Sequence, residues 1–157
     1  MLHMHAHHVP ETVVHMRVSG GELRTKQVFG RHTSLMIASR SSGYHSLPHR
    51  HDCEQVNYVQ SGEMWVFIED TAYRLRAGDF LRIPPRAVHW AWNRSQSDCA
   101  LIEVHSPGLL LPGLDDAPEL LTDVESETGI NKVPNEWADA SYWEREVAAL
   151  AAYGVTR

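Results

Sequence analysis

Cysteine is scarce in this chain. Among 157 residues there are only Cys53 and Cys99, so the chain can close at most one disulfide bond. Small secreted domains often depend on several disulfides, whereas a cysteine-poor chain is typical of a reducing compartment. At this length one domain buries roughly two-thirds of its unfolded surface and needs no cross-link to fold. We therefore expect a cytoplasmic, single-domain protein.

The chain also lacks an excess of positive charge and a long apolar run. Its 14 Lys and Arg residues stand against 20 Asp and Glu residues, which gives a formal net charge of −6. Binding to a nucleic-acid backbone requires clustered positive charge, so we expect no nucleic-acid partner. No apolar stretch approaches the ~20 residues of a membrane-spanning helix, so we expect no membrane partner either.

Histidine, by contrast, is abundant, with 11 residues in the chain. Five of these lie near the start of the chain: His3, His5, His7, His8 and His15. Alternating histidines can hold a metal ion, but the surrounding sequence predicts no rigid element there. We therefore predict that residues 1–20 form an N-terminal tail.

Residues 21–112 are predicted to form an all-β barrel. Runs rich in β-branched and aromatic residues alternate with turn residues about every 8 to 12 positions, which is typical of sandwiches and barrels. The predicted strands cover residues 23–29, 33–39, 55–59, 63–68, 72–75, 79–83, 89–93 and 100–105. Prolines lie at strand ends, where no ladder hydrogen bond is lost.

Residues 113–157 have a different character. They begin as an acidic, proline-containing connecting segment and end in a predicted C-terminal α-helix of about three turns. Ser141 and Glu144 have the spacing of a capping box, and Gly154 suits the end of the helix. Apolar side chains at helical spacing are predicted to pack this helix on the barrel: Trp143, Val147 and Leu150 with Ala151.

The histidines of the central region have the spacing of metal ligands. His49 and His51 are two residues apart, so both project from one face of a strand, with Cα atoms roughly 6.5 Å apart. Because metal–nitrogen bonds are about 2 Å long, the two imidazoles can meet on one ion. Gln55 follows closely enough for a turn to bring its amide oxygen back, and His89 would arrive from a distant strand. We predict that these four residues bind one divalent metal ion (Zn, Ni, Fe or Mn).

Two segments around these residues resemble the two conserved motifs of the cupin superfamily. The residues that match the first motif, G-x5-H-x-H-x3-E-x6-G, are Gly43, His49, His51 and Gly62. The residues that match the second, G-x5-P-x-G-x2-H-x3-N, are Gly78, Pro84, His89 and Asn93. The resemblance covers residues 22–107. It implies a double-stranded β-helix (jelly roll, the cupin barrel) with a metal ion in its mouth, usually assembled as a homodimer.

Two positions depart from the family pattern. Gln55 stands at the Glu position of the first motif, so the ligands would be three neutral imidazoles and a neutral amide. An ion that keeps its full +2 charge is a stronger electrophile toward a carbonyl or enolate. Arg86 replaces the middle Gly of the second motif, a residue that tolerates unusual backbone angles, so we expect the loop before His89 to differ.

Two alternatives to the Gln55 assignment stay open. Gln55 could lie beside an ion that is bound by the histidines alone. Glu54 could instead be a carboxylate ligand if the turn were one residue shorter. The six-residue gap to Gly62 favours Gln55, and strand alternation then turns Glu54 the other way.

Glu103 and His105 are two residues apart in the last predicted strand and share a face. If that face points inward, Glu103 is a candidate catalytic acid or base, and His105 is a candidate auxiliary ligand or proton relay. If it points outward, both are ordinary surface residues. Ile102 and Val104 would make an equally good core face, but the family comparison favours an inward Glu103.

Within the cupins, residues 49–63 look most like two groups of small enzymes. One group comprises pectin-degradation cupins that act on unsaturated uronates, and the other comprises polyketide-cyclase-type cupins. Leu109 stands where the uronate group carries a functional arginine, so a carboxylate-binding cation is missing there. The leucines at positions 109–111 indicate a more apolar substrate, which favours the cyclase-like group.

These observations predict a metal-dependent enzyme that acts on a small-molecule substrate. We expect a Lewis-acid cyclase, isomerase or lyase acting on a keto or enol compound that is polyketide- or sugar-derived. One alternative is a cupin dioxygenase that uses Fe(II) or Ni(II) and O2, because three imidazoles suit those ions as well. The other is a non-enzymatic module that senses a metal or small molecule.

Overall fold

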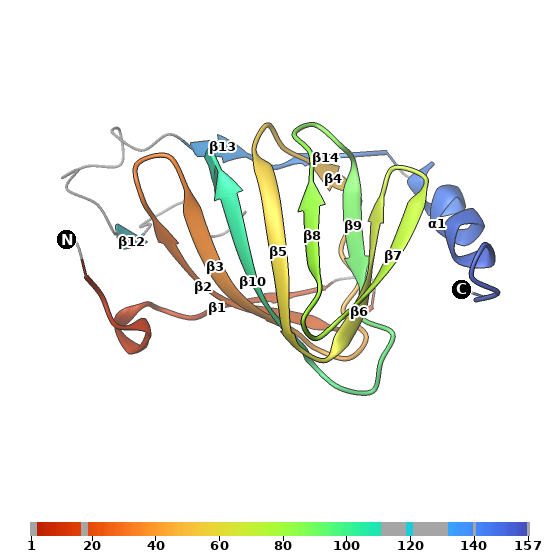
Figure 1. The fold of residues 1–157 in the computed structure, drawn as a ribbon, viewed down its shortest axis with the longest axis horizontal. Coiled ribbons are helices and arrows are strands. Elements are labelled where there is room, and N and C mark those ends of the chain that lie inside the picture. The colour runs from red at the N-terminus through yellow and green to blue at the C-terminus, as the bar shows by residue number, and fades with distance from the viewer. Residues whose placement is uncertain (1–2, 17–18, 111–118, 121–131, 140, 157) are drawn as a thin grey trace.

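Two large β-sheets and one C-terminal helix make up the fold (Figure 1). The computed structural model describes all residues except 1–2, 17–18, 111–118, 121–131, 140 and 157. The elements, in chain order, are η1 (Ala6–His8), β1 (Thr12–His15), β2 (Glu22–Phe29), β3 (Ser34–Arg40), β4 (His49–Arg50), β5 (Glu54–Ser61), β6 (Glu63–Ile68), β7 (Thr71–Arg76), β8 (Phe80–Ile83), β9 (His89–Trp92), β10 (Cys99–Ser106), β11 (Gly108–Leu110), β12 (Glu119–Leu120), β13 (Lys132–Pro134), β14 (Glu136–Trp137) and α1 (Tyr142–Ala151). The prediction of an all-β jelly roll with a C-terminal helix is confirmed.

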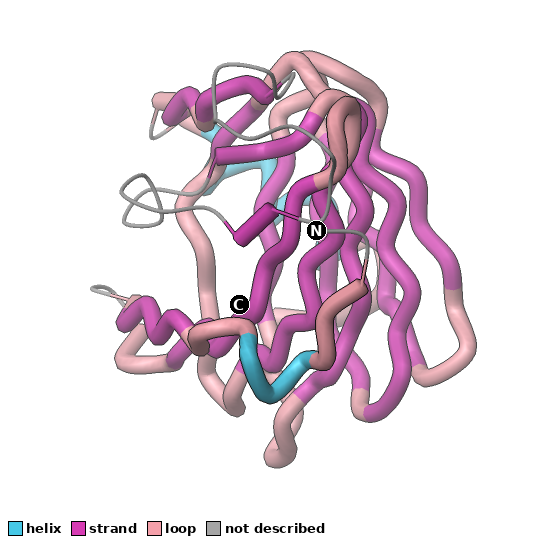
Figure 2. The backbone as a smooth tube through the Cα atoms, turned by 90° about the vertical axis from the view of Figure 1, so that its left-hand side faces the viewer, coloured by secondary structure: helices cyan, strands magenta, loops and turns pink. Residues whose placement is uncertain are grey.

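The sheet order brings together strands that are far apart in the sequence. One sheet runs β1-β2-β3-β10-β5-β8, with β12 beside β2, and the other runs β14-β4-β9-β6-β7. The last long strand, β10, lies between β3 and β5, and both of its pairings are antiparallel. Strands make up most of the described trace in Figure 2. Because of this strand order, residues that are far apart in the sequence face the same interior between the two sheets.

Strand alternation in β10 settles which of its side chains face that interior. The buried residues of β10 are Cys99, Leu101, Glu103 and His105. The intervening residues are partly or largely exposed, and Val104 keeps 37% of its surface accessible. Because successive side chains of a strand point to opposite faces, Glu103 and His105 are both directed inward.

Two apolar clusters stabilise the barrel, one on each side of the five-stranded sheet. The inner cluster lies between the two sheets and includes Met36, Val59, Met64 and Leu101. The outer cluster joins α1 to the back of the sheet, and its buried members are Trp65, Phe67, Ala72, Val88, Trp90, Ala149 and Leu150. The helix therefore covers the outer face of the sheet whose inner face holds His89.

The N-terminal segment differs from the predicted tail. Residues 12–15 form β1, which pairs antiparallel with β2 and places Thr12 opposite Thr25 and His15 opposite Glu22. The His15 Nδ1 atom lies 3.1 Å from the Glu22 carboxylate, so this edge is held by side chains as well. This strand is only four residues long, and the local sequence does not show that it pairs with β2.

The C-terminal helix begins where the sequence predicts but not by the predicted cap. Ser141 has helical backbone angles, and its side chain makes no capping hydrogen bond to the helix. Instead, the Ser141 N–H donates to Asp139 Oδ1 at 2.8 Å, so the Asp139 side chain accepts a backbone hydrogen bond at the start of the helix. Gly154 has φ +67° after the helix, as expected for its end. No helix among the described residues is long and apolar enough to cross a membrane.

The buried face of α1 matches the predicted apolar stripe only in part: Leu150 is buried and Trp143 packs against the outer cluster. Val147 is 45% exposed, whereas Glu146 is fully buried beside Ala149 and Leu150. The Glu146 Oε2 atom accepts a hydrogen bond from Trp90 Nε1 at 2.6 Å and lies 2.8 Å from His45 Nε2. These buried polar contacts of Glu146 fix which face of α1 is turned toward the sheet, and a pattern of apolar residues does not predict them.

Replacing Glu146 should reveal this anchor. In Glu146→Ala, the Trp90 indole and the His45 imidazole lose their buried acceptor, which should lower the free energy of unfolding by about 2–4 kcal/mol. Urea denaturation followed by circular dichroism measures the change. The exposed neighbour Glu144→Ala serves as the control and should stay within about 0.5 kcal/mol of the parent protein. Equal effects of the two substitutions would contradict the assignment.

Candidate metal centre

Three imidazoles from two separate stretches of chain converge inside the barrel. His49 lies on β4 and His89 on β9, where the two residues are register partners, and His51 follows β4 directly. One ring nitrogen from each lies within 4.8 Å of the others. The ring centroids are 4.3 Å apart for His49 and His89 and 4.7 Å apart for His51 and His89. This is the convergence that the sequence predicts for a metal site.

Backbone carbonyls orient all three rings in the same way. The Nδ1–H groups of His49, His51 and His89 donate to the carbonyl oxygens of Leu47, Cys53 and Ala87 at 2.8, 3.0 and 3.0 Å. Each ring therefore keeps its Nε2 lone pair for the centre of the cluster. The buried Nε2 atom of His89 has no hydrogen-bond partner among the described residues. An imidazole held by an outer carbonyl and open at Nε2 is the usual state of a metal-binding histidine, so the residues fit a metal ion.

Gln55 presents its amide oxygen to the same point. Gln55 lies on the inner face of β5, and its Oε1 atom is 3.1 Å from His51 Nε2. Its Nε2 group donates to Asn57 Oδ1 at 2.8 Å and to Glu103 Oε2 at 3.3 Å, which fixes the amide with its oxygen toward His51. The lone pairs of His51 Nε2 and Gln55 Oε1 repel each other at this separation, and a cation bound by both atoms would remove that repulsion. Gln55 could thus be a fourth ligand.

Glu54, the alternative to Gln55, points away from the site. It faces outward on β5, where its Oε2 atom accepts from Arg82 Nε at 2.6 Å. The neighbouring Arg82 lies opposite Val56 on β8, on the same outer side of the sheet. Strand alternation therefore decides between the two candidates.

The three imidazoles are electrically neutral near neutral pH. Burial lowers the pKa of His49 to about 4. It also lowers the pKa of His51, and burial together with the neighbouring His49 brings that of His89 well below the ordinary value. Neutral imidazole is the form that binds metal ions, so no proton has to be displaced before a metal binds at pH 7.

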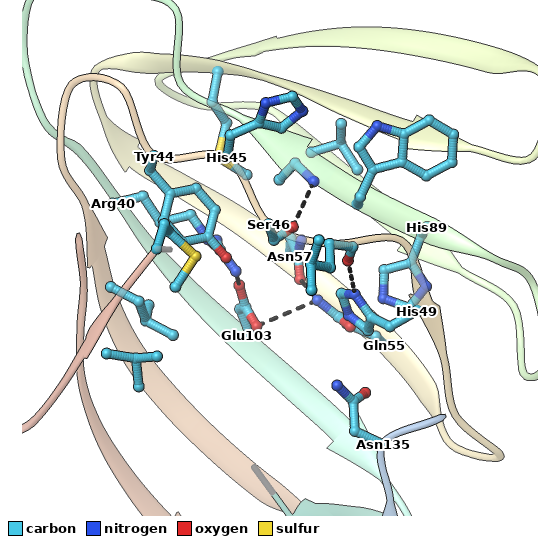
Figure 3. A pocket seen from close by; sticks show the side chains of 18 of the residues that line it. Arg40, Tyr44, His45, Ser46, His49, Gln55, Asn57, His89, Glu103 and Asn135 are labelled. Carbon is cyan, nitrogen blue, oxygen red and sulfur yellow. Dashed lines mark hydrogen bonds and ion pairs between the residues drawn. The ribbon is translucent and has the colours of Figure 1, made fainter. Parts of the chain in front are cut away.

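Glu103 lies beside the histidines as a buried carboxylate. It is 2% exposed, and its Oε1 atom accepts a short hydrogen bond from Arg40 Nη2 (Figure 3). Burial alone would raise the pKa of Glu103, but the Arg40 guanidinium holds it below its ordinary value. Glu103 is therefore ionised at neutral pH and lines the cavity, as the inward alternative for this strand requires.

His105 lies behind Glu103 rather than on the wall of the cavity. It is fully buried, with Nε2 3.7 Å from Glu103 Oε2 and Nδ1 3.5 Å from the Ser34 hydroxyl oxygen. Burial lowers its pKa to about 4, so the ring is neutral. It is not one of the three clustered histidines whose ring nitrogens lie within 4.8 Å. At 3.7 Å the two side chains are too far apart to share a hydrogen bond, so His105 packs behind the Glu103 carboxylate without bonding to it.

The histidine cluster opens into a largely apolar cavity of about 410 Å³ (Figure 3). Its apolar lining comes from both sheets and from β1: Val14, Met16, Leu23, Met36, Leu47, Met64, Val66, Ile83, Ala91 and Leu109. Arg40 and Asn57 add polar groups that motif reasoning does not single out, and Tyr44 also lines the cavity. Strand alternation offers a signal for Arg40, because it shares the inner face of β3 with Met36 and Ala38.

Residues of the predicted connecting segment also reach the site. Strand β14 pairs with β4 and places Trp137 opposite His49, with the two ring centroids 6.0 Å apart. Asn135 lies next to β14 and lines the cavity, as Figure 3 shows. Glu136 of the same strand accepts from Arg50 Nε at 3.1 Å, which ties the segment to the barrel. Spacing rules could not find these residues, because their position follows from a pairing across the chain.

Arg86 corrects one expectation about the loop before His89. It has φ +68°, the left-handed conformation that the family glycine would adopt easily, so the loop keeps this geometry. Its backbone N–H donates to the His51 carbonyl oxygen at 2.9 Å. Its guanidinium contacts Asp52 and Glu136 at 3.2 and 3.0 Å. These contacts connect the loop before His89 to the segment that carries His51.

The fold is a jelly-roll barrel with a histidine cluster that could hold a metal ion, and one family model matches its central part. Residues 39–105 match the family model of the cupin domain, so this part of the chain is a cupin domain. The matched range includes all three clustered histidines, Gln55 and Glu103. No curated protein matches the chain in sequence.

Solved structures with the same fold come from several kinds of cupin. An RmlC-like cupin from Shewanella frigidimarina is 23% identical, with a TM-score of 0.54 over 66% of this chain and 88% of that one. The polyketide cyclase RemF from Streptomyces resistomycificus is 21% identical, with a TM-score of 0.57 over 68% and 79%. KdgF from a Halomonas species is 22% identical, with a TM-score of 0.53 over 61% and 87%. At these identities the likeness establishes the fold.

The buried histidines predict how the stability of the metal-free protein depends on pH. The folded pKa of His49 and His105 is about 4, below the ~6.5 of an unfolded chain. Between these values the unfolded state binds more protons, so stability falls as the pH drops from 6.5 to 4. Thermal unfolding in EDTA should show a lower Tm at pH 4.5 than at pH 7.

Single substitutions separate this effect from general acid denaturation. His105→Gln removes one titrating group and should make the decline of Tm with pH shallower. The exposed His32→Gln serves as the control and should follow the parent protein. A decline that is equally steep in both variants would contradict the role of His105.

Proposed function

We propose that this protein is a metal-dependent enzyme that catalyses a cyclisation, isomerisation or elimination without net redox change on a keto or enol substrate. In this proposal, Nε2 of His49, His51 and His89 and Oε1 of Gln55 bind one divalent ion. When bound, such an ion supplies Lewis-acid polarisation of a keto or enol oxygen. The open side of the cluster faces the cavity, where a small-molecule substrate would lie.

The observation that carries the proposal is the neutrality of the donor set. The pKa values of the three histidines are lowered by burial, and Gln55 contributes a neutral amide. The nearby carboxylate of Glu103 is already engaged by Arg40 Nη2 and by Gln55 Nε2. A site without an anionic ligand favours a +2 ion and electrophilic chemistry over cycling to a +3 state.

Glu103 is the residue best placed to move a proton. It is ionised, lines the cavity and is linked to Gln55 by a hydrogen bond of 3.3 Å, so it lies next to the proposed ligand cluster. We infer that it accepts a proton from the carbon or oxygen next to the substrate carbonyl and returns it later. The apolar wall of the cavity excludes water from the reacting atoms, and His105 packs behind Glu103 without a hydrogen bond to it.

The first test combines metal analysis with turnover in the absence of oxygen. His89→Ala should lower the bound zinc by about one ion per chain relative to the parent protein, because one of three imidazoles is lost. The control His32→Ala removes an exposed histidine outside the site and should keep the metal content. The N-terminal histidines are present in all three proteins, so adventitious binding by them does not contribute to the difference. Mass spectrometry of the native protein and elemental analysis measure the stoichiometry.

The same preparation tests the reaction class. Under nitrogen, the zinc-loaded protein should accelerate α-proton exchange of ethyl acetoacetate in D2O, followed by NMR, and His89→Ala should not. Activity that requires both Fe(II) and O2 would replace this proposal with the dioxygenase alternative. Metal binding without turnover on a wide panel of keto compounds would favour a sensing module.

Gln55→Glu tests the electrophile argument directly. The carboxylate should retain the metal ion but neutralise part of its charge, so we expect α-proton exchange to slow by about tenfold or more. Gln60→Glu introduces the same charge at an exposed position of the same strand and should leave the rate unchanged. If Gln55→Glu kept both full metal content and full rate, the neutral donor set would have no bearing on the chemistry.

A further inference from the structure

Arg40 has hydrogen-bonding capacity that the described protein leaves unused. Its guanidinium is buried in the cavity wall, and the residue is 7% exposed. Nη2 donates to Glu103, but Nε and Nη1 have no hydrogen-bond partner among the described residues. Leaving a buried charged donor unsatisfied is costly, which is why such a group in a cavity indicates a ligand.

The pairing with Glu103 holds the Arg40 guanidinium in place but uses only part of its hydrogen-bond donors. A guanidinium carries five N–H groups in a rigid plane and can bind two carboxylates at once. Glu103 occupies one donor, and the second Glu103 oxygen is turned toward Gln55 Nε2, 3.3 Å away. The Tyr44 ring covers the guanidinium, with Cζ 5.2 Å from the ring centroid. The remaining donors are thus preorganised.

The charge balance of the cavity favours a negatively charged ligand. Among the described lining residues, Arg40 is the single Arg or Lys and Glu103 the single Asp or Glu, so their charges cancel. On the proposed function, a divalent ion leaves the cavity with an uncompensated charge of about +2 in surroundings of low polarity, which a substrate anion would offset.

We propose that Arg40 binds a carboxylate of the substrate, which makes the substrate a keto or enol acid with an apolar body. This proposal rests on the proposed function for the keto end, which would lie at the histidine cluster. The apolar body fits the wall formed by Val14, Leu23, Met36, Met64 and Leu109. Leu109 stands where the uronate-acting cupins carry an arginine, so that position offers no cation for a carboxylate. Arg40 offers a cation from a different strand, β3.

The test measures carboxylate recognition in metal-free protein, so that it does not depend on the metal site. Octanoate and octan-1-ol share an apolar chain and differ at the head group. After EDTA treatment, isothermal titration should show octanoate binding the native protein at least about tenfold more tightly than octan-1-ol, with one site per chain.

A paired substitution removes the charge of Arg40 without leaving a lone buried carboxylate. In Arg40→Met with Glu103→Gln, the preference for octanoate should fall to within about twofold. The control, Arg82→Met with Glu54→Gln, removes an equivalent ion pair on the outer face of the same sheet and should keep the full preference. Circular dichroism verifies that each variant folds.

Several outcomes would overturn the proposal: no octanoate binding by the native protein, no preference over octan-1-ol, a preference that survives in the Arg40 pair, or its loss in the control pair. If the Arg40 pair does not fold, Arg40→Lys decides the question. Lysine keeps the charge but loses the planar fork, so the preference should fall by about threefold or more. An unchanged preference would then overturn the proposal. Metal content, measured separately, tells whether the proposed function has failed instead.

Discussion

Three hydrogen bonds from imidazole Nδ1 to backbone carbonyls are the constraint on which the site depends. They involve carbonyls of Leu47, Cys53 and Ala87, all in irregular backbone beside short strands. Each bond selects the tautomer that is protonated at Nδ1 and so directs the Nε2 lone pair toward the centre of the cluster. The pairing of β4 with β9 brings the Nε2 atoms of His49 and His89 close together. Because these contacts are made to the main chain, the geometry of the cluster is as rigid as the barrel itself.

A second layer of polar contacts runs from the cluster into the barrel wall. Gln55 connects to Glu103, and Glu103 connects to Arg40, so that one chain of hydrogen bonds crosses β5, β10 and β3. A buried ion pair of this kind adds little net stability, because desolvation offsets much of the attraction. Its value lies in holding a carboxylate ionised and a guanidinium oriented within an apolar cavity. The proposed carboxylate binding by Arg40 and the proposed proton transfer by Glu103 would thus share one network.

Part of this arrangement is predictable from pattern because the relevant physics is local. The two-residue spacing of His49 and His51 and the alternation that separates Gln55 from Glu54 follow from the geometry of a strand. The inward orientation of Glu103 did not follow, since its neighbours made an equally good core face. The left-handed Arg86 and the rotation of α1 about Glu146 were missed because each depends on partners distant in sequence.

The strand periodicity of the amino-acid sequence determined the all-β class, and the resemblance to the cupin motifs implied the jelly roll and the clustered histidines. Residue type alone determined the neutral character of the fourth candidate ligand. Only the tertiary structure decided that β1 and β14 line the cavity and that His105 stands behind Glu103. Those placements depend on strand pairings between distant segments, which are selected by the packing of the whole barrel and leave no local pattern.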